Sequence, residues 1–220
     1  MKVCIIGNGL VSLALANVLI QKDLLVDIII PYKYKKYPQS RTLGISKSNL
    51  EYFNSNILNI KKVPWEIKQI KIYTEKFTKN EIINFSNSNK QIFSMIKNHK
   101  LNELLIKNLK KNKKVKFKKN VKYNNLSKED YKLIINCETN HEITKKFFSK
   151  KIEKKYNSYA FTTVLSHKKL TENNVAIQIF TNNGPIAFLP ISNTHTSVVY
   201  SHKIHKDNNK IDIKNLIKKF

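Results

Sequence analysis

The first 23 residues constrain the fold of this chain more than any other stretch. Lys2–Ile6 (KVCII) is a short apolar run with β-branched residues, as a buried β-strand requires. Gly7-Asn8-Gly9 follows, and then an amphipathic segment rich in Ala and Leu, residues 10–22, which predicts a helix. A strand, a tight glycine turn and a helix in this order indicate the opening of a βαβ unit, and therefore an α/β fold.

The glycine turn has the spacing of a dinucleotide-binding motif. Gly7 permits the turn, and Gly9 lets the backbone approach a pyrophosphate at the helix N-terminus. Ser12 stands where the pattern G-x-G-x-x-G has its third glycine, and it is small enough for close packing of the helix on the strand. The alternative is a strand, turn and helix that bind no ligand, and the short motif alone does not exclude it.

A secretory signal peptide is the main rival interpretation of the same stretch. Asn8 and Asn17 interrupt its apolar run, and no A-x-A-like cleavage site precedes Lys22. No segment approaches the apolar length of a membrane helix. We therefore expect a cytoplasmic protein, at most peripheral to the inner membrane.

The charge of the chain suggests nucleic acid or an anionic surface as a partner. The formal net charge is +26, from 41 Lys+Arg against 15 Asp+Glu. Arg41 is the only arginine, however, and there are only 4 glycines in 220 residues, against a usual share of about 7%. Lys, Asn and Ile have AT-rich codons, whereas Arg and Gly have GC-rich ones. We therefore interpret the charge as codon drift that produced a mostly solvated surface, which makes the remaining glycines and Arg41 more informative.

The second strand is predicted over residues 24–30 (LLVDIII). A dinucleotide site usually has Asp or Glu at the end of this strand to hold a ribose hydroxyl. Ile30 stands there instead, and the next acid is Glu51. A helix is expected from Lys47 to about Ile57, with Ser46 as its N-cap.

The rest of the chain divides by periodicity. Residues 65–93 alternate in short strand-like pieces, and residues 101–109 have helical spacing. Short strands at 115–117 and 133–137 are expected to return to the parallel sheet. From residue 159 to 201 the pattern is antiparallel, with a hairpin turn at 181–185, and residues 211–220 predict an amphipathic helix. Cys4 and Cys137 fall in or beside strand-like runs, which favours small core residues over a disulfide or a metal site.

Three stretches resemble motifs of one enzyme family. They are KVCIIGNGLVSLALANVL (residues 2–19), RTLGIS (41–46) and AIQIFTNNGPIAFLPISNTHTSVVYS (176–201). They resemble three motifs of the FAD-dependent hydroxylases of ubiquinone biosynthesis. The first stretch is similar to the N-terminal FAD motif of this family, and the second to its R-x-L-x-[LI]-S motif. The third is similar to its F-x-x-x-G-P-x-A-x-L-P block and the S-x-V-W that follows it. The members of this family are monooxygenases of the UbiH/VisC type, related to p-hydroxybenzoate hydroxylase. All four glycines and the only arginine lie in these stretches, and Tyr200 replaces the tryptophan.

The resemblance implies a Rossmann-like FAD-binding parallel sheet with an inserted antiparallel β-sheet substrate domain. The FAD-binding domain would comprise residues 1–63 and 96–150, and the substrate domain residues 64–95 and 151–220. FAD would be the cofactor, NAD(P)H the reductant, and a lipophilic aromatic quinone precursor the substrate. Further partners would be an anionic membrane surface or other proteins of ubiquinone biosynthesis, with no specific nucleic acid.

The resemblance also assigns site residues. The expected cofactor-binding residues are Gly7, Gly9, Leu10, Val11, Ser12, Arg41 and Glu138. The expected wall of the substrate chamber comprises Phe180, Gly184, Pro185, Leu189 and Pro190. No general acid or base can be named, and no metal ligands are expected.

The chain departs from the family in two places. The middle Asp-Gly motif reads Glu138-Thr139, and the later Gly-Asp motif and C-terminal helix have no counterpart. We therefore expect an N-terminal portion of such an enzyme that by itself binds FAD weakly or not at all. Two alternatives stay open: a non-catalytic remnant that serves as a binding or assembly module, and a basic nucleic-acid-binding protein.

Overall fold

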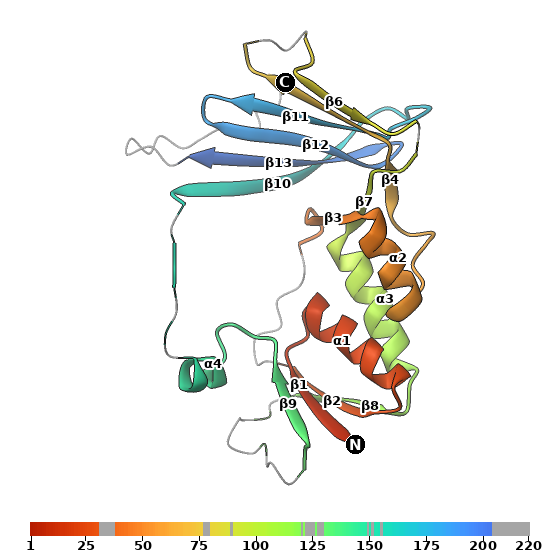
Figure 1. Cartoon of the computed structure of the whole chain (residues 1–220), viewed down its shortest axis with the longest axis vertical. Helices are drawn as coiled ribbons and strands as arrows, with labels where there is room; N and C mark the ends of the chain where they lie inside the picture. Colours follow the sequence, from red (N-terminus) through yellow and green to blue (C-terminus); the bar gives the residue numbers. More distant parts are fainter. Residues whose placement is uncertain are drawn as a thin grey trace.

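The computed structural model describes residues 1–30, 38–76, 80–88, 90–119, 121, 126, 130–148, 150, 152–154 and 156–203. Within them it contains three sheets and four helices. The predicted helix over residues 211–220 lies outside the described residues. Figure 1 shows a four-stranded sheet at one end of the molecule and a six-stranded sheet at the other, with helices and a small sheet between them.

The four-stranded sheet is parallel throughout, as the N-terminal βαβ pattern predicts. Its order is β8-β2-β1-β9, with the first strand of the chain in the interior of the sheet. The strands are β1 (Lys2–Ile6), β2 (Leu25–Ile30), β8 (Val115–Lys119) and β9 (Leu133–Asn136). All four lie where the sequence predicts them, to within two residues at each end.

Three helices stack between this sheet and the rest of the molecule (Figure 1). They are α1 (Leu10–Gln21), α2 (Lys47–Asn56) and α3 (Asn98–Lys110). Their apolar side chains share one core with the strands, in which Ile5, Leu13 and Leu105 are fully buried. A hydrogen bond joins α1 and α3 inside this core: the Asn108 amide donates to Oδ1 of Asn17 at 2.7 Å.

The opposite face of the parallel sheet carries a buried carboxylate. Asp27 on β2 is 2% exposed and accepts hydrogen bonds from Tyr131 at 2.7 Å and Lys118 at 2.9 Å, with Lys2 at 3.2 Å. Burial alone would raise the pKa of Asp27, but the hydrogen bonds from Lys118, Tyr131 and Lys2 outweigh burial and lower it below its usual value. Burial, with the Asp27 charge nearby, raises the pKa of the Cys4 thiol to about 11, so this cysteine is a core residue, as predicted.

The six-stranded sheet has the order β10-β13-β12-β11-β5-β6. Its strands are β5 (Gln69–Thr74), β6 (Ile83–Ser86), β10 (Ser158–Ser166), β11 (Val175–Thr181), β12 (Gly184–Ser192) and β13 (His195–Lys203). Every pair is antiparallel except β11 with β5, which is parallel. The predicted antiparallel sheet is therefore correct except at this junction, where two segments about a hundred residues apart in the chain are paired.

A three-stranded sheet, which the sequence analysis does not predict, lies between the helices and the six-stranded sheet (Figure 1). It pairs β3 (Thr42–Ser46) with β7 (Phe93–Lys97), and β7 with β4 (Trp65–Ile67), all antiparallel. The strand-like pieces predicted over residues 65–93 are thus divided between two sheets, because β4 joins this sheet while β5 and β6 join the large one. A fourth helix, α4 (Glu142–Phe147), follows β9 and was also not predicted.

Candidate functional site

The candidate site is built around the glycine turn that links β1 to α1. Gly7 has a φ of 120°, which side-chain-bearing residues rarely adopt, and its N–H extends the sheet by donating to the Ile29 carbonyl at 2.9 Å. Gly9 is the N-cap of α1 with a φ of −72°, a value that any residue adopts. The turn therefore needs glycine at Gly7 for its conformation, whereas the conformation of Gly9 does not require glycine.

Three of the predicted site residues meet at this turn. A Cβ atom on Gly7 would lie 2.8 Å from Oε1 of Glu138 and 2.9 Å from Oγ of Ser12. Glu138 reaches the turn because β9 is the neighbour of β1, so their carboxyl ends adjoin. Ser12 is 1% exposed, and its hydroxyl has no hydrogen-bond partner among the described residues.

The N-terminus of α1 favours a negatively charged ligand. The first turn of this helix contains no acidic residue, and its side chains provide no cap. The N–H groups of Leu10, Val11 and Ser12 therefore have no partner within the helix and carry the positive end of its dipole. The Val11 side chain is 73% exposed, so solvent reaches this end of the helix.

Two features near the glycine turn do not suit a dinucleotide. Glu138 is close enough to Gly7 to repel an approaching diphosphate. The second is the end of β2 at Ile30, where no acidic residue stands to hold a ribose. The N-terminus of α1 thus favours a pyrophosphate, whereas Glu138 opposes one and the end of β2 provides no support for the adenosine half.

Arg41 lies on a different element from the glycine turn. It precedes β3, its side chain is exposed, and its carbonyl accepts from the Asn98 N–H at 3.0 Å at the start of α3. In the part of the chain that the structure describes, no hydrogen bond or ion pair holds its guanidinium. Arg41 is therefore available to an anionic ligand, but the structure does not bring it into contact with Gly7, Ser12 or Glu138.

Two buried asparagines in the first turns of α3 were missed by the sequence analysis. Asn98 and Asn102 lie one turn apart on α3 and are 6% and 5% exposed. Oδ1 of Asn98 and Nδ2 of Asn102 have no hydrogen-bond partner among the described residues. Buried polar atoms without partners are rare and call for an explanation. The abundance of Asn in this chain hides such positions in the sequence.

The predicted substrate wall does not form a single surface. Successive side chains of a strand point to opposite faces, and Leu189 packs with Ile67 and Met95 of the three-stranded sheet. By the same alternation Phe180 and its partner Pro185 share the Leu189 face, whereas Pro190 lines a groove on the other face. Glycine is required at position 184 by the packing of the backbone, since a Cβ on Gly184 would lie 1.9 Å from the Ser201 carbonyl oxygen.

No family model matches the sequence, and no curated relative matches it either. Solved structures match the fold. HpxO of Klebsiella pneumoniae, in complex with FAD and uric acid, has a TM-score of 0.75 at 11% identity, covering 100% of this chain and 60% of that one. PqsL of Pseudomonas aeruginosa, described as a probable FAD-dependent monooxygenase, has a TM-score of 0.70 at 12% identity, covering 92% and 60%.

A third neighbour, CtdE in complex with FAD and a substrate, has a TM-score of 0.74 at 12% identity, covering 99% of this chain and 62% of that one. These likenesses show that the chain has the fold of FAD-dependent monooxygenases. It spans about three fifths of the length of each neighbour. Among the described residues, no helix is long and apolar enough to cross a membrane, and no group of side chains is arranged to hold a metal ion.

Proposed function

We propose that the chain is the FAD-binding and substrate-sheet part of an FAD-dependent aromatic hydroxylase. The observation that carries the proposal is the glycine turn at the end of β1, with the unpartnered Ser12 hydroxyl beside it, in a fold whose neighbours HpxO and CtdE bind FAD. FAD, when bound, supplies the redox chemistry that uses NAD(P)H and O₂ to hydroxylate an electron-rich ring.

The residues of the chain would bind and orient this cofactor. The N–H groups of Leu10 and Val11, at the positive end of α1, would donate to the pyrophosphate, with Gly9 allowing its close approach. Arg41 would add a charge-assisted hydrogen bond from the start of β3. Glu138 would have to turn away from Gly7 as the pyrophosphate enters.

The substrate would lie on the face of the six-stranded sheet that is turned toward the parallel-sheet unit. Phe180, Pro185 and Leu189 are on this face, and Phe180 is 46% exposed. An apolar surface excludes water from the reacting ring. The class of substrate that we propose is a lipophilic aromatic precursor of ubiquinone, supported by the G-P-x-A-x-L-P block at residues 184–190.

An FAD titration, followed by quenching of flavin fluorescence, tests the proposal. We expect the wild type to bind weakly but saturably, with a Kd of about 0.1 mM or above. Gly9→Val should abolish saturable binding while the protein remains folded, because a φ of −72° accepts valine and the valine side chain blocks the pyrophosphate. Gly44→Ala is the matched control, because it replaces a glycine in β3, on a different element from the turn, and it should leave binding unchanged.

A second variant tests Arg41. Arg41→Ala should weaken FAD binding by about 1.5–3 kcal/mol, the range for a hydrogen bond to a charged group. Lys62→Ala, which removes an exposed cation from the loop after α2, is its control and should leave the Kd unchanged. Absence of saturable binding, or equal binding by the wild type and Gly9→Val, would overturn the proposed cofactor.

A non-catalytic binding module is the second candidate function. The carboxylate of Glu138 beside Gly7 favours it, because a diphosphate would have to displace a like charge. The FAD titration separates the two candidates, since the remnant should bind no FAD under any of these conditions.

A further inference from the structure

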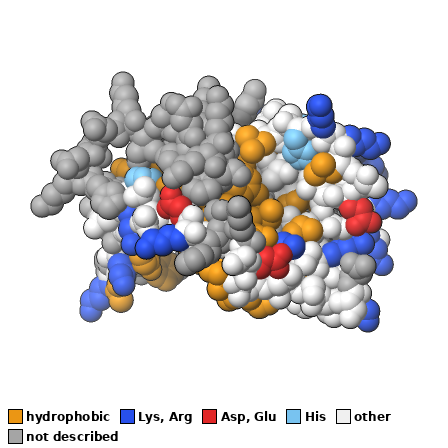
Figure 2. All heavy atoms as spheres, turned by 90° about the horizontal axis from the view of Figure 1, so that it is seen from above, with side chains coloured by type: hydrophobic (Ala, Val, Ile, Leu, Met, Phe, Trp, Pro, Cys, Tyr) orange, Lys and Arg blue, Asp and Glu red, His pale blue; other side chains and the backbone are white. Residues whose placement is uncertain are grey.

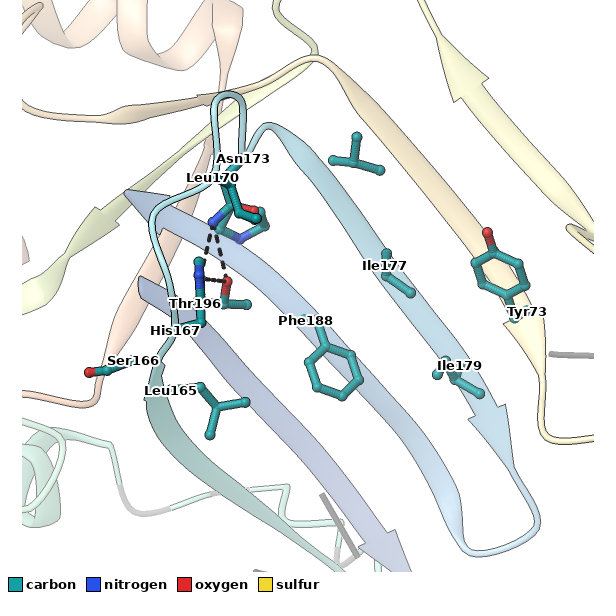
Figure 3. Close-up of a pocket in the computed structure, with 12 residues that line it drawn as sticks. Tyr73, Leu165, Ser166, His167, Leu170, Asn173, Ile177, Ile179, Phe188 and Thr196 are labelled. Carbon is teal, nitrogen blue, oxygen red and sulfur yellow. Dashed lines mark hydrogen bonds between the residues drawn. The ribbon is translucent and has the colours of Figure 1, made fainter. Parts of the chain in front are cut away.

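The polar side chains of the two hollows in this molecule differ in whether the protein itself pairs them. The groove that Pro190 lines has a volume of about 700 Å³ and is mainly apolar, and Figure 2, seen from above, shows apolar side chains gathered over this end of the molecule. The polar side chains at one end of the groove, His167, Asn173 and Thr196, are hydrogen-bonded to one another (Figure 3). The glycine turn differs, because the Ser12 hydroxyl has no partner among the described residues.

The carboxylate of Glu138 at the same turn is also without a partner. Asp23, Asp27 and Glu81 form ion pairs with lysines, as expected in a chain with a net charge of +26. Within the part of the chain that the structure describes, no hydrogen bond or ion pair engages the Glu138 carboxylate, and its Oε1 lies 2.8 Å from the position of a Cβ on Gly7. No described lysine or arginine is therefore paired with this negative charge at the turn.

Hydrogen bonds hold the backbone of Glu138 in place. Its N–H donates to Oδ1 of Asn136, the last residue of β9, at 3.0 Å. Its carbonyl accepts from the Asn136 amide at 3.2 Å, from the Thr144 hydroxyl at 3.0 Å and from the His141 N–H at 3.2 Å. The Asn136 amide also donates to Oγ1 of Thr144 at 2.7 Å, so β9 and α4 together fix the position of Glu138.

A fixed backbone limits how far the carboxylate can move. Rotation of the Glu138 side chain can carry the carboxylate away from Gly7, but the Cα of Glu138 stays beside the turn. A ligand with phosphate groups at the N-terminus of α1 would therefore meet a like charge at short range, at a half-buried residue where solvent screens it less than on the open surface. An uncharged ligand would meet no such repulsion.

We propose that Glu138 determines the charge of the ligand that the glycine turn accepts, with Asn136 and Thr144 as its positioning residues. The inference rests on the proposed function, because it concerns the same turn. Glu138 disfavours the diphosphate of FAD, whereas it does not affect a flavin without phosphate, such as riboflavin. The chain thus contains its own cause of weak FAD binding.

The test repeats the FAD titration with Glu138→Gln. This variant should bind FAD at least about tenfold more tightly than the wild type, because the like charge is gone. Glu138→Met, which is similar in length but has no amide to donate, should show the same gain, which excludes a new hydrogen bond as the cause. Glu142→Gln is the matched control: it removes the same charge from the first residue of α4, where the side chain is exposed, and should leave the Kd unchanged.

Two further measurements separate charge from structure. Riboflavin, which has no phosphate, should gain nothing from Glu138→Gln. Thr144→Val removes a hydroxyl that fixes Glu138, and it should tighten FAD binding by about two- to fivefold in the wild type but not in Glu138→Gln. A purely structural role of Thr144 would instead change the Kd equally in both proteins and would exclude it as a positioning residue.

The results distinguish this inference from the proposed function. Saturable FAD binding with the same Kd for the wild type and Glu138→Gln would overturn the inference alone, as would an equal gain for riboflavin. Saturable binding by Glu138→Gln but not by the wild type would support the inference and overturn the proposed cofactor of the wild type. If circular dichroism shows both proteins folded and neither binds FAD saturably, both the inference and the proposed cofactor are wrong. If Glu138→Gln is unfolded, Glu138→Met decides by the same criteria.

Discussion

Gly184 is the glycine whose backbone the structure constrains most. Its φ is 130°, and a Cβ would lie 1.9 Å from the Ser201 carbonyl oxygen of the neighbouring strand, a backbone atom that cannot move aside cheaply. We expect Gly184→Ala to lower the free energy of unfolding by at least about 3 kcal/mol, since strain at φ and a backbone clash add together. Urea unfolding measures this loss.

Gly44→Ala provides the comparison for Gly184. Gly44 is in β3, and a Cβ there would meet Met95 and Phe93 side chains at 3.7 Å, an ordinary contact. This variant should be neutral or stabilising by about 0.5 kcal/mol, because alanine has less conformational freedom to lose in a strand. Equal losses for the two variants would show that the hairpin does not depend on the conformation of Gly184.

Asp27 makes stability depend on pH. Its folded-state pKa is below the unfolded value of about 3.9, so its contribution is fully present above that value and is lost as the pH falls through the folded pKa. Asp27→Asn should cost about 3–5 kcal/mol at pH 7, because the buried hydrogen bonds of Lys118, Tyr131 and Lys2 lose their charged partner. The difference from the wild type should shrink as the pH is lowered from 5 toward 2 in urea titrations.

Asp23 serves as the control for Asp27. It pairs with Lys114 on the surface, where its side chain is 86% exposed, so solvent screens the interaction. Asp23→Asn should change the unfolding free energy little at any pH. A pH-independent difference for Asp27→Asn would mean that packing, and not charge, is what the residue contributes.

At the scale of the element, α2 is a helix whose start the sequence predicts and the structure confirms. Ser46 has extended backbone geometry and its hydroxyl accepts from the Asn49 N–H at 3.2 Å. Ser46→Ala should lower the unfolding free energy by about 1 kcal/mol, as loss of an N-cap does. Ser55→Ala, in the last turn of the same helix, should be neutral or slightly stabilising, and an equal loss there would remove the capping explanation.

The elements that could be predicted are those with a local cause. β1, α1 and β2 follow from an apolar run, a glycine turn and a 3.6-residue period, and Gly184 after Asn182-Asn183 marks the hairpin. The three-stranded sheet could not be predicted, because β4 has only three residues and its pairing with β7 depends on contacts distant in sequence. The parallel pairing of β11 with β5 could not be predicted either, because it also joins segments distant in sequence.

The residues of the candidate site also divide into those that the sequence predicts and those that it does not. The motif spacing places Gly7 and Ser12 together because they share one turn, and Glu138 joins them through strand order, which the βαβ pattern implies. The approach of Asn98 to Arg41 depends on the unpredicted sheet, so no local pattern shows it. The five residues of the substrate wall were predicted to form one surface, whereas strand alternation separates Leu189 from Pro190.

At the scale of the whole molecule, the charge is spread over the surface. No described lysine is fully buried, and the sequence carries a net charge of +26. Lysines occur on α3, on β8, in α4 and in the loop after β10, elements that lie in different parts of the fold (Figure 1). A dispersed charge of this kind attracts polyanions without reading their sequence.

Salt titration against DNA and lipid tests this interpretation of the charge. Binding to random-sequence DNA should be no tighter than about 10⁻⁶ M near physiological salt and should weaken steeply as salt rises, because counterion release dominates it.

Anionic vesicles should also bind the protein, at about 1 kcal/mol for each well-placed lysine, which would bring it near a lipophilic substrate. Neutral vesicles are the control and should not bind. High salt should release the protein from anionic vesicles, because exposed charges more than about one Debye length apart no longer interact. Nanomolar, sequence-selective DNA binding that survives high salt would contradict the flavin interpretation and favour a nucleic-acid-binding protein.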